Sequence, residues 1–284
     1  IIGLGAFVLE DESREIKNFD LRKYNYQRHI QLICLNKTGY HNLNYLVSLS
    51  YTKGKLGGIP FISKDLLEKY HEGLVVLSGG MQSEINMNFK EGKDEDARQI
   101  AIWYRDLFQS RYYIEIQNTG ISEQGIINQQ LIKLGKELDI PLVGTNNCFY
   151  LTPEEAESQH ILRLMGLQLK LTDEGAPLQS GDQCFLKSYN EMFSAFEDLP
   201  KSCLENTIKI ANECDLSLEN NKIFLPQIYT NADETVESML RSEAKEGLEK
   251  RITKLYELYD NGVDFEEFKK PYLERLSFEL DVII

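Results

Sequence analysis

Short apolar runs alternate with amphipathic helical segments over most of the chain, and this alternation limits its fold more than any other feature. The apolar runs that suit buried strands lie at 6–9, 30–35, 74–77, 112–116 and 141–144. Strands that alternate with helices this often predict an α/β architecture, with a largely parallel sheet or barrel. In such folds the functional groups lie at the carboxyl ends of the strands.

Two of the segments between these runs have a clear helical period. Within 94–109 and within 123–138, apolar residues recur so that they share one face of a helix. These apolar residues are Ala97, Ile100, Ala101, Tyr104, Phe108, Ile127, Leu131, Leu134 and Leu138. A shorter helix is expected to begin at Lys64, because Ser63 directly before it is a good N-cap residue.

The pattern changes near residue 216, which we take as a domain boundary. Phe224-Leu225-Pro226-Gln227 has the character of an extended linker. Beyond it, apolar residues recur every three to four positions from Val236 to Leu255, which predicts a long helix, and 272–284 is expected to begin another. The sequence therefore predicts an α/β domain over 1–216 and a mainly helical segment over 217–284.

The composition excludes some classes of function. The chain has 284 residues, of which 42% are hydrophobic, so it can bury a sizeable core. Its formal net charge of −14 argues against a surface that holds nucleic acid non-specifically, because such surfaces need clustered Lys and Arg. It does not exclude a place in a machine that handles DNA.

The five cysteines are widely spaced, odd in number and form no CxxC pair, so we expect buried thiols in a reducing compartment. No apolar run approaches the ~20 residues that span a bilayer, and no signal peptide is visible. These features predict a cytoplasmic location and no membrane partner. The ends are apolar, Ile1-Ile2-Gly3 and 278–284, where natural termini are usually polar. We therefore expect a piece of a longer chain.

Four histidines are the first candidates for chemistry: His29, His41, His71 and His160. None has the HxH, HxxxH or HExxH spacing of a local zinc motif. His41, His71 and His160 lie on or near predicted helices, where a surface or capping role is expected. His29 opens a strand and can either point into a pocket or be structural.

Polar residues at the strand ends offer little catalytic chemistry. Ser78-Gly79-Gly80 lacks the Lys of a phosphate-binding loop and predicts a tight turn. Thr145-Asn146-Asn147 has no acid, base or nucleophile with a partner, and Cys148 needs a histidine that only the fold can bring near it. The acidic triplet Asp94-Glu95-Asp96 is either a cation site or, more simply, the first turn of a helix. From the residues alone we expect no catalytic, cofactor-binding or metal-binding residues.

An ordered set of motifs resembles the family of bacterial DNA polymerase III alpha subunits. Each motif is weak alone, but their order is specific and the resemblance covers essentially the whole chain. The motifs are Asn36-Lys37-Thr38-Gly39-Tyr40 with Asn42-Leu43, Glu72-Gly73-Leu74, Leu77-Ser78-Gly79-Gly80, Trp103-Tyr104-Arg105, Gly144-Thr145-Asn146-Asn147, Leu204-Glu205-Asn206-Thr207, Phe224-Leu225-Pro226, Ala244-Lys245-Glu246-Gly247-Leu248, Glu274-Arg275-Leu276 and Glu279-Leu280-Asp281-Val282-Ile283.

The resemblance implies that 1–216 is most of a PHP domain, a distorted β/α barrel whose first strands lie upstream of this chain. The segment 217–284 would then start the polymerase core and lead into the palm, whose aspartates and catalytic magnesium would lie beyond Ile284. The implied parent is a replicative DNA-directed DNA polymerase, a nucleotidyltransferase. Its implied partners are a proofreading exonuclease subunit, the sliding clamp, other holoenzyme subunits and primer-template DNA.

The resemblance also identifies the positions that bind metal in family members with an intact PHP site. Those members have a Glu, a His, a Cys and an Asp-x-His pair where this chain has Gly5, His29, Gly80, Asn147 and Phe149. Only His29 matches, and neither glycine nor phenylalanine side chains can bind a metal. We therefore expect a metal-free structural PHP domain that docks the exonuclease. The alternatives are a free-standing PHP-type metal-dependent phosphoesterase and a pure interaction module.

Overall fold

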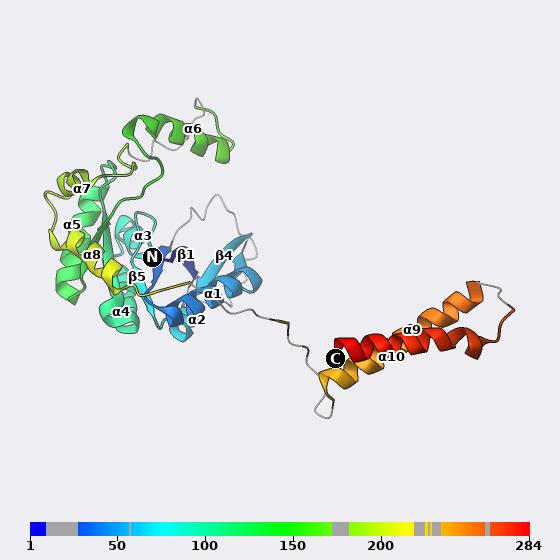
Figure 1. Cartoon of the computed structure of the whole chain (residues 1–284). Helices are drawn as coiled ribbons and strands as arrows, with labels where there is room; N and C mark the ends of the chain where they lie inside the picture. The colour runs from blue at the N-terminus through cyan, green and yellow to red at the C-terminus, as the bar shows by residue number, and fades with distance from the viewer. Residues whose placement is uncertain are drawn as a thin grey trace. The chain divides into compact units, whose positions relative to one another are not determined.

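The chain forms two compact units, Ile1–Leu218 and Glu219–Ile284 (Figure 1). The division falls at residue 218, where the sequence predicted 216. Phe224 and Gln227 of the expected linker lie outside the described residues. No helix in the described part of the chain is long and apolar enough to cross a membrane. This computed structural model describes residues 1–9, 28–56, 58–171, 182–218, 225–226, 228, 234–258 and 262–284.

The first unit is built on a sheet whose strand order is β3-β4-β1-β2-β5-β6-β7. The pairs β1–β4, β5–β6 and β6–β7 are parallel, whereas β2 is antiparallel to both of its neighbours and β3 is antiparallel to β4. Five strands therefore run one way, and β2 and β3 run the other. The strands are β1 (Gly3–Leu9), β2 (His29–Cys34), β3 (Lys55–Leu56), β4 (Ile59–Ser63), β5 (Leu74–Leu77), β6 (Tyr112–Gln117) and β7 (Leu142–Thr145).

Helices connect the strands and extend beyond the sheet. Ser63 caps α2 as expected, because its side-chain oxygen accepts a hydrogen bond from the Leu66 amide at 3.3 Å. The helices of the first unit are α1 (Lys37–Thr52), α2 (Lys64–Lys69), α3 (Glu84–Lys90), α4 (Asp94–Phe108), α5 (Gln124–Leu138), α6 (Ala156–Gly166), α7 (Tyr189–Ala195) and α8 (Ser202–Glu213), with 3-10 turns at Gln109–Arg111 and Pro153–Glu155.

The predicted α/β class, followed by a helical segment, is confirmed. The expected strands at 74–77 and 112–116 coincide with β5 and with all but the last residue of β6, and the helices expected at 94–109 and 123–138 match α4 and α5 within one residue. The sequence did not predict β3, β4 or the reversed direction of β2. Among the described residues the sheet has β3 at one edge and β7 at the other.

Both faces of the central strands are buried. Leu74 and Val76 of β5 join one apolar cluster, whereas Val75 and Leu77 join another. This separation follows from the period of two along a strand, and burial on both faces is typical of parallel strands covered by helices. The second cluster includes Ile210 of α8, so α8 covers the face opposite the larger core. Cys34, Cys184 and Cys203 are buried, as the sequence predicted, whereas Cys148 is exposed and Cys214 is partly buried.

Two glycines let α1 approach the loop before β5. A Cβ atom on Gly39 would lie 1.9 Å from the carbonyl oxygen of Gly73, so only glycine fits this contact. The same carbonyl accepts a hydrogen bond from the Leu35 amide at 2.9 Å. The side chain of Asn36 caps α1 by accepting from the Gly39 amide at 3.0 Å. The motif that contains Gly39 and the motif that contains Gly73 thus meet through backbone contacts.

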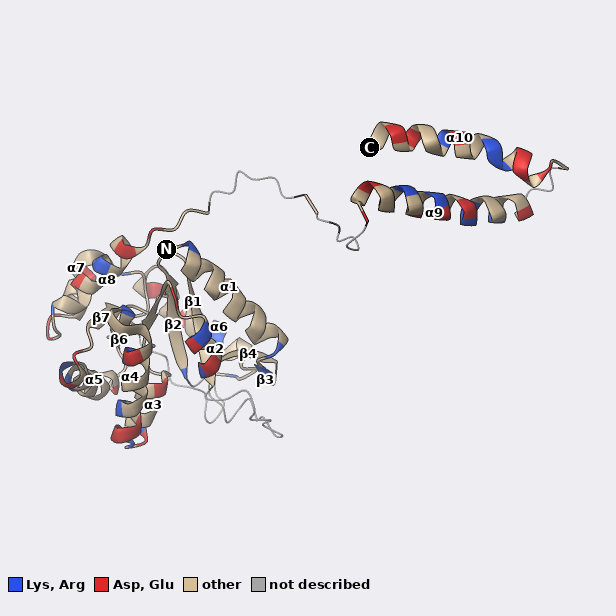
Figure 2. Ribbon diagram, turned by 90° about the horizontal axis from the view of Figure 1, so that it is seen from below, with Lys and Arg blue, Asp and Glu red and all other residues tan. Residues whose placement is uncertain are grey.

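The second unit is a helical hairpin of α9 (Val236–Leu258) and α10 (Phe265–Ile283). Both helices carry interspersed charges of both signs (Figure 2). The helix α10 begins seven residues earlier than the expected start at 272. The reason is local, because Asp264 accepts a hydrogen bond from the Glu266 amide at 3.0 Å and caps the helix, while Pro271 is accommodated inside it.

Candidate functional site

The reversed strand β2 places a histidine at the functional edge of the sheet. β1, β4, β5, β6 and β7 share one direction, so their carboxyl ends meet at one edge. Because β2 runs the other way, its first residue, His29, lies at that same edge, opposite Phe7 of β1. The candidate site is therefore built from His29 and the residues that end the other strands, and we call it the strand-end edge.

His29 fills the space beside Gly5. A Cβ atom on Gly5 would lie 2.5 Å from Nε2 of His29, so the imidazole occupies the room that a side chain at position 5 needs. The ring packs edge-on against Phe7, with centroids 5.5 Å apart. Burial lowers the pKa of His29 below its usual range, which favours the neutral imidazole.

The turn after β5 packs closely on the same histidine. Gly79 has φ +90°, and a Cβ atom there would lie 2.0 Å from the carbonyl oxygen of His29. A Cβ atom on Gly80 would lie 2.5 Å from Oε1 of Gln117, so the Gln117 amide occupies that space. The Ser83 amide donates to the Gly80 carbonyl at 2.8 Å and closes the turn. The tight turn that the sequence predicted is present.

The segment after β7 lies against a different part of the chain. The Phe149 amide donates to the carbonyl of Cys184 at 2.8 Å, and the Cys148 thiol lies 3.7 Å from the carbonyl of Phe185. Asn147 and Phe149 are both exposed. The structure thus brings Gly5, His29 and Gly80 together, whereas Asn147 and Phe149 face solvent and Cys148 contacts a backbone carbonyl.

The other candidates of the sequence have structural surroundings. His41 is exposed on α1. The Nδ1 atom of His71 lies 2.8 Å from the Glu68 carbonyl at the end of α2. His160 lies within α6 with its ring partly buried. Asp94-Glu95-Asp96 forms the exposed first turn of α4, where carboxylates favour the positive end of the helix dipole.

These residues do not fit the metal cluster of an intact PHP site. Neither Gly5 nor Gly80 has a side chain, and His29 and Gln117 fill the space that ligands at those positions would occupy. In the described part of the chain, no group of three or more His, Cys, Asp and Glu residues is arranged to hold a metal ion.

A buried carboxyl group lies at this edge that the sequence analysis missed. Glu115 of β6 is 3% exposed. Its Oε1 atom accepts hydrogen bonds from the amide of Gln117, at 2.7 Å, and from the hydroxyl of Thr145. The backbone amide of Glu115 donates to Ser78 Oγ at 2.9 Å, which ties β6 to the end of β5. The Oε2 atom has no hydrogen-bond partner among the described residues.

Burial raises the pKa of Glu115 above its usual range, and hydrogen bonds from Thr145, Gln117 and the Gly79 amide partly offset this. Because Glu115 lies inside an apolar run, the sequence pattern predicted a buried strand there and no functional side chain. The signal was available, since Glu115 and Gln117 are two residues apart and so share one face of the strand.

Replacement of Glu115 by Gln is expected to change how stability depends on pH. Because its pKa is raised, the carboxyl group of Glu115 binds its proton more tightly in the native state than in the unfolded chain. The stabilisation that this bound proton provides is complete below the pKa of Glu115 in the unfolded chain. It is lost as pH rises through the pKa of Glu115 in the native state. The amide of Gln is neutral at every pH. We therefore expect Glu115→Gln to gain stability relative to the parent as pH rises.

Urea unfolding over a pH series measures this difference. Glu137→Gln, which removes an exposed carboxylate from α5, is the control and should keep the parent's pH dependence. If Glu115→Gln and the parent showed the same dependence of stability on pH, the raised pKa of Glu115 would be wrong.

The first unit matches a known family over part of its length. Residues 1–119 match the family model of the PHP domain. Over most of its length the chain is related to DNA polymerase III alpha subunits, as its motifs indicated. It is 37% identical over 215 residues to that of Borreliella burgdorferi, which covers 76% of this chain and 18% of the relative.

Two further relatives cover more of the chain. It is 32% identical over 255 residues to the DNA polymerase III subunit alpha of Pseudomonas aeruginosa, which covers 90% of this chain and 22% of the relative. It is 31% identical over 258 residues to that of Escherichia coli strain K12, again covering 90% and 22%. The chain therefore spans about a fifth of the length of these relatives.

Proposed function

We propose that this chain is part of a replicative DNA-directed DNA polymerase. The supporting observation is its similarity to DNA polymerase III alpha subunits, which extends over 90% of its length in two of the relatives. Under this proposal the first unit is the PHP domain and the second unit leads into the polymerase palm. The catalytic residues and their magnesium belong to the rest of the parent chain, which also meets primer-template DNA and the sliding clamp in the cytoplasm.

Primer extension tests the polymerase assignment. The parent chain should extend a DNA primer on a template in the presence of magnesium, and the 284-residue chain alone should not. Extension by the 284-residue chain would contradict our placement of the catalytic residues. A parent chain that does not extend primers would contradict the assignment to a polymerase.

The PHP domain itself is proposed to be structural and metal-free. The support is geometric, because His29 and Gln117 occupy the space beside Gly5 and Gly80. The remaining candidate positions, Asn147 and Phe149, are exposed. A neutral imidazole, an amide oxygen and the Glu115 carboxyl, which already accepts hydrogen bonds from Gln117 and Thr145, supply few of the ligands that zinc or manganese needs.

We expect purified chain to hold far less than one zinc or manganese ion per molecule after incubation with either metal and desalting. Elemental analysis by mass spectrometry gives the ratio, and His29→Ala is the matched control, which should give the same low value. Stoichiometric metal that disappears in His29→Ala would overturn the proposal. Hydrolysis of a phosphomonoester that depends on this metal would favour the free-standing phosphoesterase.

The same domain is proposed to dock a separate proofreading exonuclease. An acidic chain with no metal cluster in its described residues is suited to bind a protein rather than to hold DNA itself. Co-elution of the chain with the exonuclease subunit of its own organism, in gel filtration, tests this role. Separate elution at micromolar concentrations of both proteins would contradict it.

A further inference from the structure

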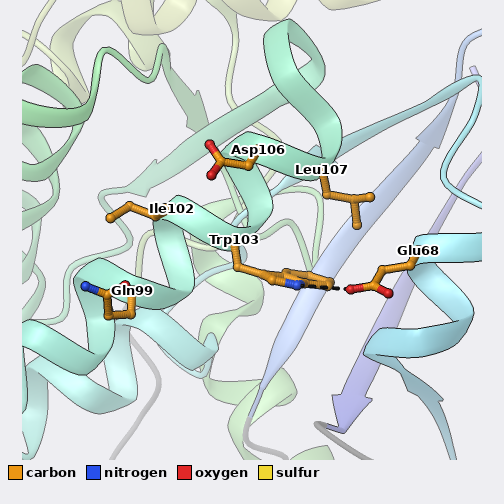
Figure 3. A pocket seen from close by; sticks show the side chains of 6 residues that line it. All are labelled: Glu68, Gln99, Ile102, Trp103, Asp106 and Leu107. Carbon is orange, nitrogen blue, oxygen red and sulfur yellow. Dashed lines mark hydrogen bonds between the residues drawn. The ribbon is translucent and has the colours of Figure 1, made fainter.

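A surface depression lies between α2 and α4, and it shares no residue with the strand-end edge (Figure 3). It is open to solvent and has a volume of about 500 Å³. The residues that line it are Glu68, Gln99, Ile102, Trp103, Asp106 and Leu107.

The centre of the depression is Trp103, the single tryptophan of the chain. Its ring is only partly buried. The indole N–H donates to Oε1 of Glu68 at 3.4 Å, which fixes the ring across the gap between the two helices. Ile102 and Leu107 add apolar surface on either side. A partly exposed tryptophan with apolar neighbours is typical of the anchoring residues of protein interfaces.

The charge of the depression is negative. Its lining contains two carboxylates, Glu68 and Asp106, and no Lys or Arg. The ammonium of Lys64 lies over the Trp103 ring, 5.1 Å from its centroid. It also pairs with Glu84 at 3.2 Å, and the Lys64 side chain is 15% exposed.

Asp106 pairs with its neighbour Arg105 at 2.7 Å, and its side chain is 61% exposed. Exposed ion pairs of this kind contribute about 0–1 kcal/mol, so the carboxylate stays available to a second cation. The depression therefore combines an aromatic face, apolar walls and accessible negative charge.

We propose that this depression binds a basic, apolar peptide segment of another protein. An Arg or Lys of the segment pairs with Glu68 and Asp106, beside the Trp103 ring. An adjacent apolar side chain packs on Ile102 and Leu107. The carboxylates repel phosphate groups, so the site favours protein over nucleic acid. The proposal depends neither on the polymerase assignment nor on the exonuclease.

The fluorescence of Trp103 gives a direct test in the 284-residue chain, since no other tryptophan contributes. The probe is a short helical peptide of Arg, Leu and Ala, and the control peptide has Glu in place of Arg. We expect a saturable change with the Arg peptide that weakens as salt is added, and none with the Glu peptide.

Two double variants test whether the Arg peptide binds at the depression. Glu68→Gln combined with Asp106→Asn should lower the affinity for the Arg peptide about tenfold, as expected for the loss of two accessible ion pairs. Glu137→Gln combined with Glu157→Gln makes the same change in net charge on α5 and α6 and should leave the affinity unchanged. The proposal is overturned by an equal loss in both double variants, by the absence of a saturable change, or by tighter binding of a single-stranded oligonucleotide.

Discussion

Replacement of Gly39 by Ala is expected to lower the free energy of unfolding by about 3 kcal/mol. The new Cβ atom would lie 1.9 Å from the carbonyl oxygen of Gly73, and this neighbour is backbone, which cannot rotate away. Relief requires α1 to move off the loop. That movement weakens the hydrogen bond from the Leu35 amide to the Gly73 carbonyl and the cap formed by Asn36.

Gly125→Ala is the matched control. A Cβ atom on this α5 residue would meet nothing within 4 Å in the part of the chain that the structure describes, so the substitution should be neutral or should stabilise the chain by about 0.4–1 kcal/mol. Urea unfolding followed by the fluorescence of Trp103 reports on the first unit for both variants. If Gly39→Ala unfolded at the same urea concentration as the parent, the close contact of α1 with the loop would be wrong.

The positions of most strands could be predicted because apolar runs mark them, but their directions could not. A run such as 30–35 has the same composition whichever way it points, so the reversal of β2 becomes visible only when its pairing with β1 and β5 is known. The short strand β4 was missed because it contains Pro60, which lowers the strand signal.

The candidate site was predicted only in part, for a physical reason. The resemblance to the family identified Gly5, His29 and Gly80 as candidate positions. It did not show which side chains fill the space beside Gly5 and Gly80, because that depends on contacts between distant segments. The side chains of His29 and Gln117 reach those places because β2 begins, and β6 ends, at the same edge. The spacing of residues along the sequence does not predict such contacts.

Adjacent glycines in the turn after β5 should respond very differently to the same substitution. Gly79→Ala is expected to lower the free energy of unfolding by about 3–4 kcal/mol, because φ +90° disfavours a side chain and the new Cβ atom would lie 2.0 Å from the backbone carbonyl of His29. Gly80→Ala should cost at most about 1 kcal/mol, because the atom in its way is the terminal Oε1 of Gln117, which can move.

Two further variants separate the causes. Gly58 has φ +91°, and no described residue lies within 4 Å of an added Cβ, so Gly58→Ala measures the backbone strain alone, about 1–2 kcal/mol. The excess cost of Gly79→Ala over Gly58→Ala is then the contact with His29. Adding Gln117→Ala to Gly80→Ala should relieve the remaining clash. Equal losses in Gly79→Ala and Gly80→Ala would show that the Gln117 side chain is held as rigidly as backbone.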